Sequence, residues 1–456
     1  MRYRLSSVVL EAEDDLCCGI SKANTAVIYP GYDNHPGSLK TRLTLQANRD
    51  FSLLCEELQV PFSRCGSLMV SFGDRGTAVL KKKYENGCQS GVPGLRLLSG
   101  EEARTMEGSL APTVKSALFA PTTGTVNPWQ LCYAAAENAK ENGCEFRMGT
   151  RLLTIEREGE GYRLVADRGE LLVRAVINCA GLSSHRVHEM LFPPSVRIFP
   201  DGGDYLVLER GSLGIGRVIF RENEDGKGLT AVPTVEGSIL LGPADRAVGS
   251  DPRSTTEEGL TRLMQEAETL FPAFSRESMI RSFAAVRPNP HYIVWRNGAL
   301  VPDGRSIGSF VIERAEERFI SLIGIKTPGL TCADGLGRLV AGEVAEALDA
   351  PPRTDFDPER KAPPRLNRLI PEARAALAAA EPRYGRVVCL CEDVSEAEIR
   401  EAIRQGAVTV DGVKRRCGAS LGVCQGSRCR TRIARILAEE TGLPLGHFLG
   451  EEADGA

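Results

Sequence analysis

Apolar and polar positions alternate in two ways along the first part of the chain. Short apolar runs at residues 6–11, 174–180 and 318–325 predict β-strands, of which 174–180 has the character of a buried strand. Residues 127–142 predict a helix, because Pro128 opens an alanine-rich stretch that closes at Asn-Gly. Strands that alternate with helices indicate an α/β fold with a parallel sheet.

Between residues 195 and 315 the strand-like runs come closer together. Runs such as 205–208 and 238–241 follow one another at hairpin spacing, which predicts a second, antiparallel sheet. We therefore expect a first domain over residues 1–349, in which residues 51–125 and 195–315 form the subdomain that lines a substrate site.

The last quarter of the chain has a different composition. Residues 350–383 are rich in Pro, Arg and Ala and predict a linker that contains one short helix. A small helical domain is expected over residues 384–445, with 446–456 as a tail. Ser395 is a suitable N-cap and Gly406 a suitable helix stop. Three helices are expected in this domain, at residues 395–405, 409–416 and 427–441.

Composition and charge exclude some classes of function. The chain has 456 residues, of which 42% are hydrophobic, so two or three folded units are expected. A net charge of −4 argues against a nucleic-acid surface. No apolar run approaches the roughly 20 residues that span a bilayer, and the basic N-terminus is followed by too short an apolar stretch for a signal peptide. The sequence favours a cytoplasmic protein.

Fourteen cysteines are many for a protein of a reducing compartment, where disulfides are not expected. Nine are scattered, including the pair Cys17-Cys18, and are interpreted as buried small hydrophobic residues. The other five lie between residues 389 and 429. Four of them form two close pairs, Cys389-x-Cys391 and Cys424-x₄-Cys429. Two such pairs can bind iron or zinc, although zinc ribbons usually have C-x₂-C pairs.

The sequence around these pairs carries a more specific motif. Residues 411–414 (DGVK) and 418–426 (GASLGVCQG) precede the last cysteine. This pattern resembles the bacterioferritin-associated-ferredoxin-like [2Fe–2S] domain over about residues 387–441. The resemblance implies a [2Fe–2S] cluster with Cys389, Cys391, Cys424 and Cys429 as its ligands. Cys417 has no ligand position in that motif.

Five segments of the first domain match a second family in order. They are residues 8–11 (VVLE), 21–24 (SKAN), 31–33 (GYD), 178–181 (NCAG) and 324–331 (GIKTPGLT). They resemble the FAD-dependent glycerol-3-phosphate dehydrogenase and 2-hydroxyglutarate dehydrogenase group of the D-amino-acid-oxidase-like superfamily. The resemblance implies FAD, contacted by Glu11, Ser21, Lys22, Asn24, Gly181, Gly324, Pro328, Gly329, Leu330 and Thr331.

The chain departs from this family at its beginning. A dinucleotide fold opens with a strand, G-x-G-x-x-G and a helix, and the ribose-binding acid follows about 20 residues later. No such motif precedes Glu11, and residues 214–216 (GIG) are no substitute. The missing strand belongs at the centre of the parallel sheet, so residues 6–11 are expected to lose their neighbour.

Two explanations of this departure stay open. Met1 is an internal methionine of a longer enzyme, or the chain is a divergent subunit that holds FAD weakly or is completed by another chain. In either case we expect the polypeptide that starts at Met1 to bind FAD weakly or to fold poorly.

The resemblance also implies a site for a small anionic substrate. Arg287 matches the family's F-x-G-x-R-P position, where a guanidinium can bind a carboxylate or phosphate through two hydrogen bonds. Tyr205, in a Gly-Asp-Tyr turn, is a candidate polar contact, and residues 233–237 (PTVEG) match a segment near the substrate cleft.

The general base is not assigned from the sequence. The family often has His-Ala where this chain has Tyr29-Pro30, and Glu236 stands where histidine is frequent. A tyrosine with a pKa of about 10 is a poor base at neutral pH. His35 and His291 are alternatives that nothing else in the sequence supports.

A flavin and a one-electron cluster in one chain indicate a dehydrogenase that passes electrons to a partner subunit or a quinone pool. The expected substrate is glycerol 3-phosphate or a 2-hydroxy acid. Two alternatives stay open: an amino-acid or opine dehydrogenase subunit, and a non-catalytic electron-transfer or assembly subunit.

Overall fold

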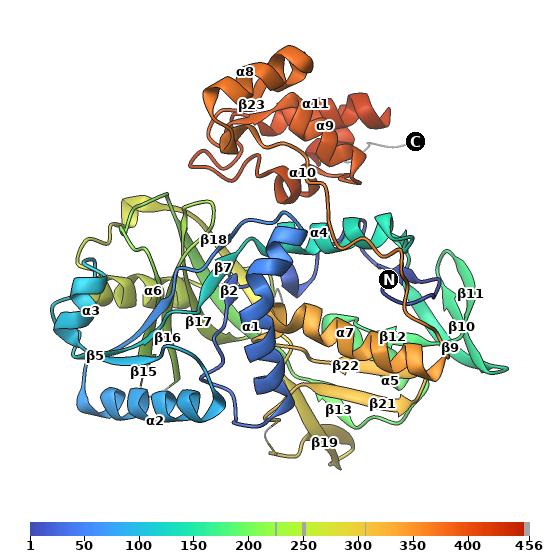
Figure 1. Ribbon diagram of the computed structural model, residues 1–456, viewed down its shortest axis with the longest axis horizontal. Helices are drawn as coiled ribbons and strands as arrows, with labels where there is room; N and C mark the ends of the chain where they lie inside the picture. The colour runs from blue at the N-terminus through green and yellow to red at the C-terminus, as the bar shows by residue number, and fades with distance from the viewer. Residues whose placement is uncertain (224–225, 249–251, 306, 451–456) are drawn as a thin grey trace.

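A computed structural model describes residues 1–223, 226–248, 252–305 and 307–450. Figure 1 shows a large body with a small C-terminal unit standing on one side of it. Within the described residues, no helix is both long and apolar enough to cross a bilayer.

An eight-stranded sheet forms one half of the body. Its order is β18-β14-β17-β16-β15-β4-β6-β5, and every neighbouring pair is antiparallel except β15 and β4. Leu206 lies opposite Leu241 in an antiparallel pair, which confirms the predicted antiparallel sheet. The strands are Met279–Arg287 (β18), Asp201–Leu208 (β14), Ile239–Ala247 (β17), Gly226–Pro233 (β16), Val218–Asn223 (β15), Ser67–Ser71 (β4), Ser116–Ala120 (β6) and Arg96–Ser99 (β5).

Two helices cover the two faces of this sheet. On one face, Leu206 and Leu241 pack with Leu263 of α6 (Glu257–Leu270) in a core of fully buried apolar side chains. On the other face, Leu80 of α2 (Asp74–Ser90) packs among strand residues that include Tyr205. The sheet is therefore a rigid wall that holds Tyr205 on β14 and Arg287 on β18.

The other half of the body holds two short parallel strand pairs. β1 (Val8–Leu10) pairs with β8 (Glu145–Arg147), and β12 (Val176–Asn178) pairs with β22 (Phe319–Ile323), whose other neighbour is β21 (Val311–Glu316). Among the described residues, β1 and β12 each keep one edge without a strand partner. The expectation that residues 6–11 lack their neighbour is confirmed.

The unpaired edges leave apolar side chains in contact with solvent. Val9 of β1 is 38% exposed and Ile177 of β12 is 40% exposed. The prediction of a buried strand at residues 174–180 is therefore wrong at Ile177. The physical reason is that the strand and helix that would cover β12 in a dinucleotide fold are not among the described residues.

The remaining elements of the body connect these sheets. Asn127 caps α4 (Pro128–Glu141) by accepting the N–H groups of Trp129 and Gln130, which confirms the predicted helix. The other helices are α1 (Leu39–Glu57), α3 (Gly100–Met106), α5 (Ser184–Glu189) and α7 (Gly329–Ala347). The other strands are β2 (Val27–Ile28), β3 (Phe62–Ser63), β7 (Gly124–Val126), β9 (Leu152–Glu158), β10 (Gly161–Ala166), β11 (Gly169–Val173), β13 (Val196–Ile198), β19 (Pro290–Arg296) and β20 (Ala299–Pro302).

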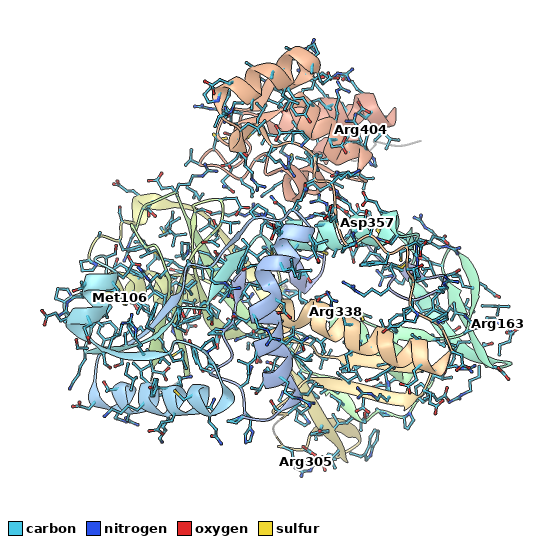
Figure 2. The ribbon with its side chains drawn as sticks, viewed as in Figure 1. Met106, Arg163, Arg305, Arg338, Asp357 and Arg404 are labelled. Atoms are coloured by element: carbon cyan, nitrogen blue, oxygen red, sulfur yellow. The ribbon has the colours of Figure 1, made fainter. Side chains whose placement is uncertain are left out.

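The connection at residues 350–383 runs along α4 rather than through open solvent. The carbonyl of Asp357, labelled in Figure 2, accepts hydrogen bonds from Asn138 and Asn142 at 3.0 and 2.8 Å. Buried Arg360 pairs with Glu137 at 2.6 Å. The connection contains α8 (Pro371–Ala380), which confirms the predicted short helix.

The C-terminal unit is helical and has its own core. Ser395 and Glu398 form a capping box at the start of α9 (Glu396–Arg404), and Thr409 caps α10 (Val410–Cys417). These two helices and α11 (Arg430–Thr441) confirm the three predicted ones. The unit also contains β23 (Val387–Cys389), β24 (Val394–Ser395) and α12 (Leu445–Leu449).

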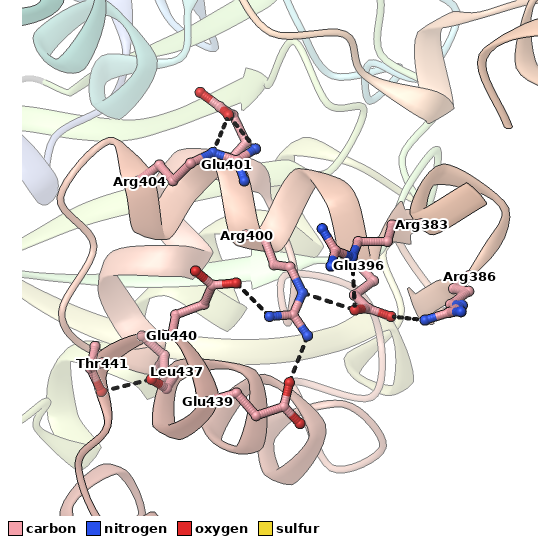
Figure 3. Close-up of polar contacts among 10 residues, drawn as sticks. All are labelled: Arg383, Arg386, Glu396, Arg400, Glu401, Arg404, Leu437, Glu439, Glu440 and Thr441. Carbon is pink, nitrogen blue, oxygen red and sulfur yellow. Dashed lines mark hydrogen bonds and ion pairs between the residues drawn. The ribbon is translucent and has the colours of Figure 1, made fainter. Parts of the chain in front are cut away.

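One arginine joins two helices of this unit. Figure 3 shows the Arg400 guanidinium of α9 between Glu396 of the same helix and two carboxylates of α11. Its nitrogens lie 2.8 Å from Glu396 and 2.6 Å from Glu439, and it also donates to Glu440. Arg400 is mostly buried, so water screens this network less than it screens an exposed ion pair.

The substitution Arg400→Met should destabilise the packing of α9 on α11. It removes the cation that Glu439 and Glu440 share, while Glu396 keeps Arg383 and Arg386 at 3.8 and 3.4 Å. We expect a loss of about 2 kcal/mol, between the values typical of exposed and of buried pairs. Hydrogen exchange of the α9 and α11 amides in the full chain should then be about 30-fold faster. Arg404→Ala is the matched control, because Arg404 contacts only Glu401 of its own helix. Equal effects of the two substitutions would contradict this role of Arg400.

Candidate functional site

The four predicted cysteine ligands come together as two pairs. The thiol of Cys389 lies next to that of Cys429, and both residues are buried. The thiol of Cys391 lies next to that of Cys424, and both are only partly buried. The neighbouring Cys389 thiol lowers the pKa of Cys429 to about 6.

Backbone and hydroxyl donors surround these sulfurs. The Ser420 hydroxyl lies 3.1 Å from the Cys429 sulfur, and the Ser420 N–H donates to the Cys389 sulfur at 3.5 Å. Such donors stabilise the negative charge of metal-bound thiolates. The loop has room for this arrangement because Gly422 has no side chain: a Cβ there would lie 2.5 Å from the Cβ of Cys391.

The paired arrangement fits a two-iron cluster better than a single ion. In a [2Fe–2S] cluster with four cysteines each iron binds two thiolates, whereas zinc needs four donors around one point. In the described part of the chain, no three His, Cys, Asp or Glu side chains converge on one metal position. The fifth cysteine of this region, Cys417, is buried and donates to the carbonyl of Val413 at 3.2 Å.

The segments predicted to contact a flavin converge in the body. The N–H of Gly324 lies 3.4 Å from the Ser184 hydroxyl, which in turn donates to the Gly181 carbonyl at 2.7 Å. The hydroxyl of Thr331, in the first turn of α7, accepts the N–H of Tyr29 at 3.1 Å. The structure therefore brings the turns at residues 181 and 324–331 together with the segment that follows Asn24.

Residue 324 has to be a glycine. It has a positive φ of +62°, and a Cβ there would lie 2.8 Å from Pro290 and 2.9 Å from the Pro288 carbonyl. Pro288 follows Arg287 directly, so the glycine turn packs against the end of the strand that carries Arg287. Beyond this turn, Pro328 is the N-cap of α7, and Gly329 and Leu330 begin the helix, whose N-terminal N–H groups can face an electronegative ring edge.

The other predicted flavin contacts lie in loops near this convergence. Ser21 and Lys22 belong to a short 3₁₀ turn, and Asn24 closes the loop by donating to the Ser21 carbonyl at 2.7 Å. The indole N–H of Trp129 donates to the Lys22 carbonyl at 2.9 Å, which ties this loop to α4. Glu11 follows β1, and one of its carboxylate oxygens accepts the Glu13 N–H at 3.0 Å.

These residues are suited to the adenosine ribose and the flavin ring of FAD, but not to its phosphates. Glu11 is a suitable acid for a ribose, and the α7 N-terminus is suitable for the flavin ring. A glycine-rich strand–turn–helix for the phosphates does not occur among the described residues, in which β1 and β12 each keep one edge without a strand partner. No contact recorded in the described part of the chain joins Glu11 to Gly181.

The candidate substrate residues lie on neighbouring strands of the large sheet, where Tyr205 is opposite Phe283 and Arg287 is opposite Asp201. Tyr205 is buried and stacks on Phe283 with ring centroids 4.9 Å apart. Arg287 pairs with Asp245 at 2.6 Å, yet its Nε is buried without a hydrogen-bond partner. Burial raises the pKa of Tyr205, and the nearby Arg287 partly offsets this rise. An arginine whose buried N–H has no partner can donate a hydrogen bond to a small anion. A neutral phenol near it can donate another.

The structure does not supply a general base in place of the missing histidine. Burial raises the pKa of Tyr29 further above neutrality. The Glu236 carboxylate accepts a hydrogen bond from Asn127 at 2.5 Å. His35 is exposed, and the ring of His291 packs edge-on against Phe199.

A buried ion pair that could not be predicted from the sequence joins the C-terminal unit to the body. The Asp15 carboxylate is 1% exposed and accepts two hydrogen bonds from Arg416 of α10, both at 2.6 Å. Arg415 and the Tyr133 hydroxyl also donate to it, each at 3.1 Å. Burial alone would raise the pKa of Asp15, but the two arginines outweigh it and the pKa is lowered.

A second ion pair lies closer to the cysteines. Arg210, which follows β14, contacts the buried carboxylate of Glu392, the residue after Cys391. The Asn367 side chain of the connection donates to the Glu392 carbonyl at 3.1 Å. The cysteine loops are therefore held against the sheet that carries Tyr205 and Arg287.

The substitution Asp15→Asn should release the C-terminal unit from the body. It leaves Arg415 and Arg416 buried without a carboxylate, at a cost of about 3 kcal/mol. Tryptic cleavage within residues 350–383 should then accelerate by about 100-fold. The cleavage rate is proportional to the fraction of molecules in which the C-terminal unit has separated from the body. Asp14→Asn is the control, since Asp14 is exposed. Unchanged cleavage in the Asp15 variant would contradict this role.

The same contact predicts how docking depends on pH. A carboxyl group whose pKa is lowered on folding stabilises the folded state fully above its unfolded pKa of about 3.9. This contribution is lost only as the pH falls through the lowered value. Hydrogen-exchange protection of α10 should therefore stay constant between about pH 5 and pH 8. A loss of protection near pH 6 would contradict it.

Comparisons with known proteins show which protein families the chain matches. Residues 2–343 match the family described as "FAD dependent oxidoreductase", and residues 387–439 match the "BFD-like [2Fe-2S] binding domain". The chain is 35% identical to the glycerol 3-phosphate dehydrogenase of Caloramator mitchellensis, over 97% of this chain and 91% of that protein. It is 31% identical to the mitochondrial L-2-hydroxyglutarate dehydrogenase of Mus musculus, over 52% of this chain and 55% of that protein.

Solved structures show the same fold at lower identity. The FAD-bound L-alpha-glycerophosphate oxidase of Mycoplasma pneumoniae matches with a TM-score of 0.70 and 20% identity, over 79% of this chain and 94% of that one. The glycerol-3-phosphate dehydrogenase of Bacillus halodurans matches with a TM-score of 0.65 and 16% identity, over 98% of this chain and 89% of that one. The chain therefore belongs to the FAD dependent oxidoreductase family and joins it to a BFD-like [2Fe-2S] binding domain, the cofactors being FAD and an iron–sulfur cluster.

Proposed function

We propose that the protein is a dehydrogenase that oxidises a small anionic hydroxy compound, glycerol 3-phosphate or a 2-hydroxy acid, and delivers the electrons to a partner protein or a quinone pool. When bound, a flavin accepts two electrons and releases them singly, and a [2Fe–2S] cluster carries one at a time. The observation that carries the proposal is the buried, unpartnered Nε of Arg287, which lies next to the Gly324 turn and on the strand that neighbours the strand of Tyr205.

The chain's own residues have separate parts in this function. Arg287 binds the substrate's phosphate or carboxylate, and Asp245 holds the guanidinium in place until the anion arrives. Tyr205 stays protonated because burial raises its pKa, so its hydroxyl can donate a hydrogen bond to the substrate. Cys389, Cys391, Cys424 and Cys429 hold the cluster. All fourteen cysteines are free of disulfides, which supports work in the cytoplasm.

A non-catalytic electron-transfer subunit is the second candidate. It is favoured by the edges of β1 and β12 that have no strand partner among the described residues and by Tyr29 in place of a histidine base. Reduction of a dye by the purified protein with glycerol 3-phosphate, 2-hydroxyglutarate and proline in parallel separates the candidates. Turnover with one of the first two supports the dehydrogenase, turnover with proline supports an amino-acid dehydrogenase, and no turnover supports the non-catalytic subunit.

The substitution Arg287→Met should lower kcat/KM for the anionic substrate by about 100-fold, mostly through KM. Removing one partner of a buried, hydrogen-bonded charge pair costs about 3 kcal/mol. Steady-state dye reduction measures this effect. Arg296→Met is the control, because Arg296 is exposed at the end of β19. An unchanged KM in the Arg287 variant would exclude the proposed anion contact.

The substitution Cys424→Ser should remove the cluster, whereas Cys417→Ser should retain it. Serine at residue 417 can donate to the Val413 carbonyl as the thiol does. The reduced-minus-oxidised visible spectrum, with iron and sulfide analysis, measures the result. Zinc without sulfide in the unsubstituted protein would show that the site is structural.

A further inference from the structure

The partly exposed cysteine pair is bordered by apolar side chains that contact solvent. Leu390, between Cys389 and Cys391, is 65% exposed, and Val423, next to Cys424, is 59% exposed. Most other large apolar side chains of the C-terminal unit are in its core. Val408 and Leu443 are exposed too, but Leu390 and Val423 are the two that directly adjoin the cysteines of the partly exposed pair.

The segment that carries Cys424 and Cys429 has a concentrated positive charge. No acidic residue occurs between Gly412 and Ala438, although the whole chain has a net charge of −4. Arg428 lies in the ligand loop, where its backbone N–H donates to the Cys424 sulfur. Arg432 and Arg435 continue from it along α11, and all three arginines are exposed.

Other arginines near them are paired. Arg374 of α8, and Arg400 and Arg404 of α9, each pair with a carboxylate of the C-terminal unit. Arg428, Arg432 and Arg435 have no carboxylate partner within the described residues. An oxidised cluster held by four thiolates is a dianion and offsets only part of this charge, because Arg432 and Arg435 lie one and two helical turns away from the ligand loop.

We propose that Leu390, Val423, Arg428, Arg432 and Arg435 form an exit face that docks an acidic electron-acceptor protein. The proposal rests on the proposed function, since it takes the cysteine pairs to hold the cluster. Exposed arginines around a small apolar centre are the composition of protein–protein interfaces, and complementary charge accelerates encounter. Two aliphatic side chains are too few for insertion into a membrane, which takes a whole apolar helix face.

The test uses the full-length protein with its cofactors and two defined probes. Flavodoxin is an acidic one-electron acceptor and cytochrome c a basic one. Calorimetric titration at low salt should show that flavodoxin binds and cytochrome c does not. The double substitution Arg428→Glu with Arg432→Glu, and separately Leu390→Ser, should each weaken flavodoxin binding by about tenfold or more, and added salt should weaken it further.

Two control substitutions match these variants in chemistry and exposure. Arg174→Glu changes an exposed arginine, and Leu172→Ser an exposed leucine, both on the body. They should leave flavodoxin binding within about twofold of the unsubstituted protein. Iron and sulfide analysis of every variant shows whether the cluster is intact, so a failure of the proposed function is seen separately from a failure of docking.

Three results would overturn the proposal. They are the absence of flavodoxin binding at low salt, an equal loss of binding in the Arg174 control, and binding of the unsubstituted protein to vesicles of anionic phospholipid that the double substitution abolishes. The last result would assign the face to a membrane surface.

Discussion

The arrangement of this protein depends on one buried charge, the Asp15 carboxylate. It lies in the loop after β1, yet its main partner, Arg416, follows it by 401 residues. A carboxylate removed from water is costly unless it is paired. Arg416 supplies two of its four hydrogen bonds, and the Arg416 guanidinium lies over the Tyr133 ring at 4.0 Å. Among the described residues, neither charged group has another oppositely charged partner that offers two hydrogen bonds. The ion pair therefore favours one position of the C-terminal unit relative to the body.

This position determines what the cysteine loops face. α10 ends at Cys417, where the ligand loop begins, so fixing Arg416 fixes the start of that loop. Arg210 and Glu392 then hold the other cysteine loop, at Cys391, against the body. The buried pair, Cys389 and Cys429, belongs to the interior of the unit, and the partly exposed pair lies at its surface. The two cysteine pairs therefore lie at different depths of one small domain.

Features that depend on neighbouring residues could be predicted from the sequence. Asn127, Ser395 and Thr409 mark helix starts because a cap acts within one turn, and the cysteine spacing is equally local. The contacts of Asp15 could not be predicted, since two arginines 400 residues away look like any exposed charges. The partner of Arg287 was missed for a similar reason: Asp245 reaches it only through the register of three strands, β17, β14 and β18.

The two ends of the candidate flavin site belong to separate small sheets, so something must keep β1 and β12 in place relative to each other. The connection does this. Its first residues follow α7, which packs on the β22 side, and they bond to the chain before β1: Arg353 donates its N–H to the Arg2 carbonyl at 2.8 Å. The Arg353 side chain also reaches the Asn142 carbonyl at 2.6 Å, beyond α4. The segment that carries the cysteine unit thus also braces the flavin site, and disturbing it should affect both cofactors.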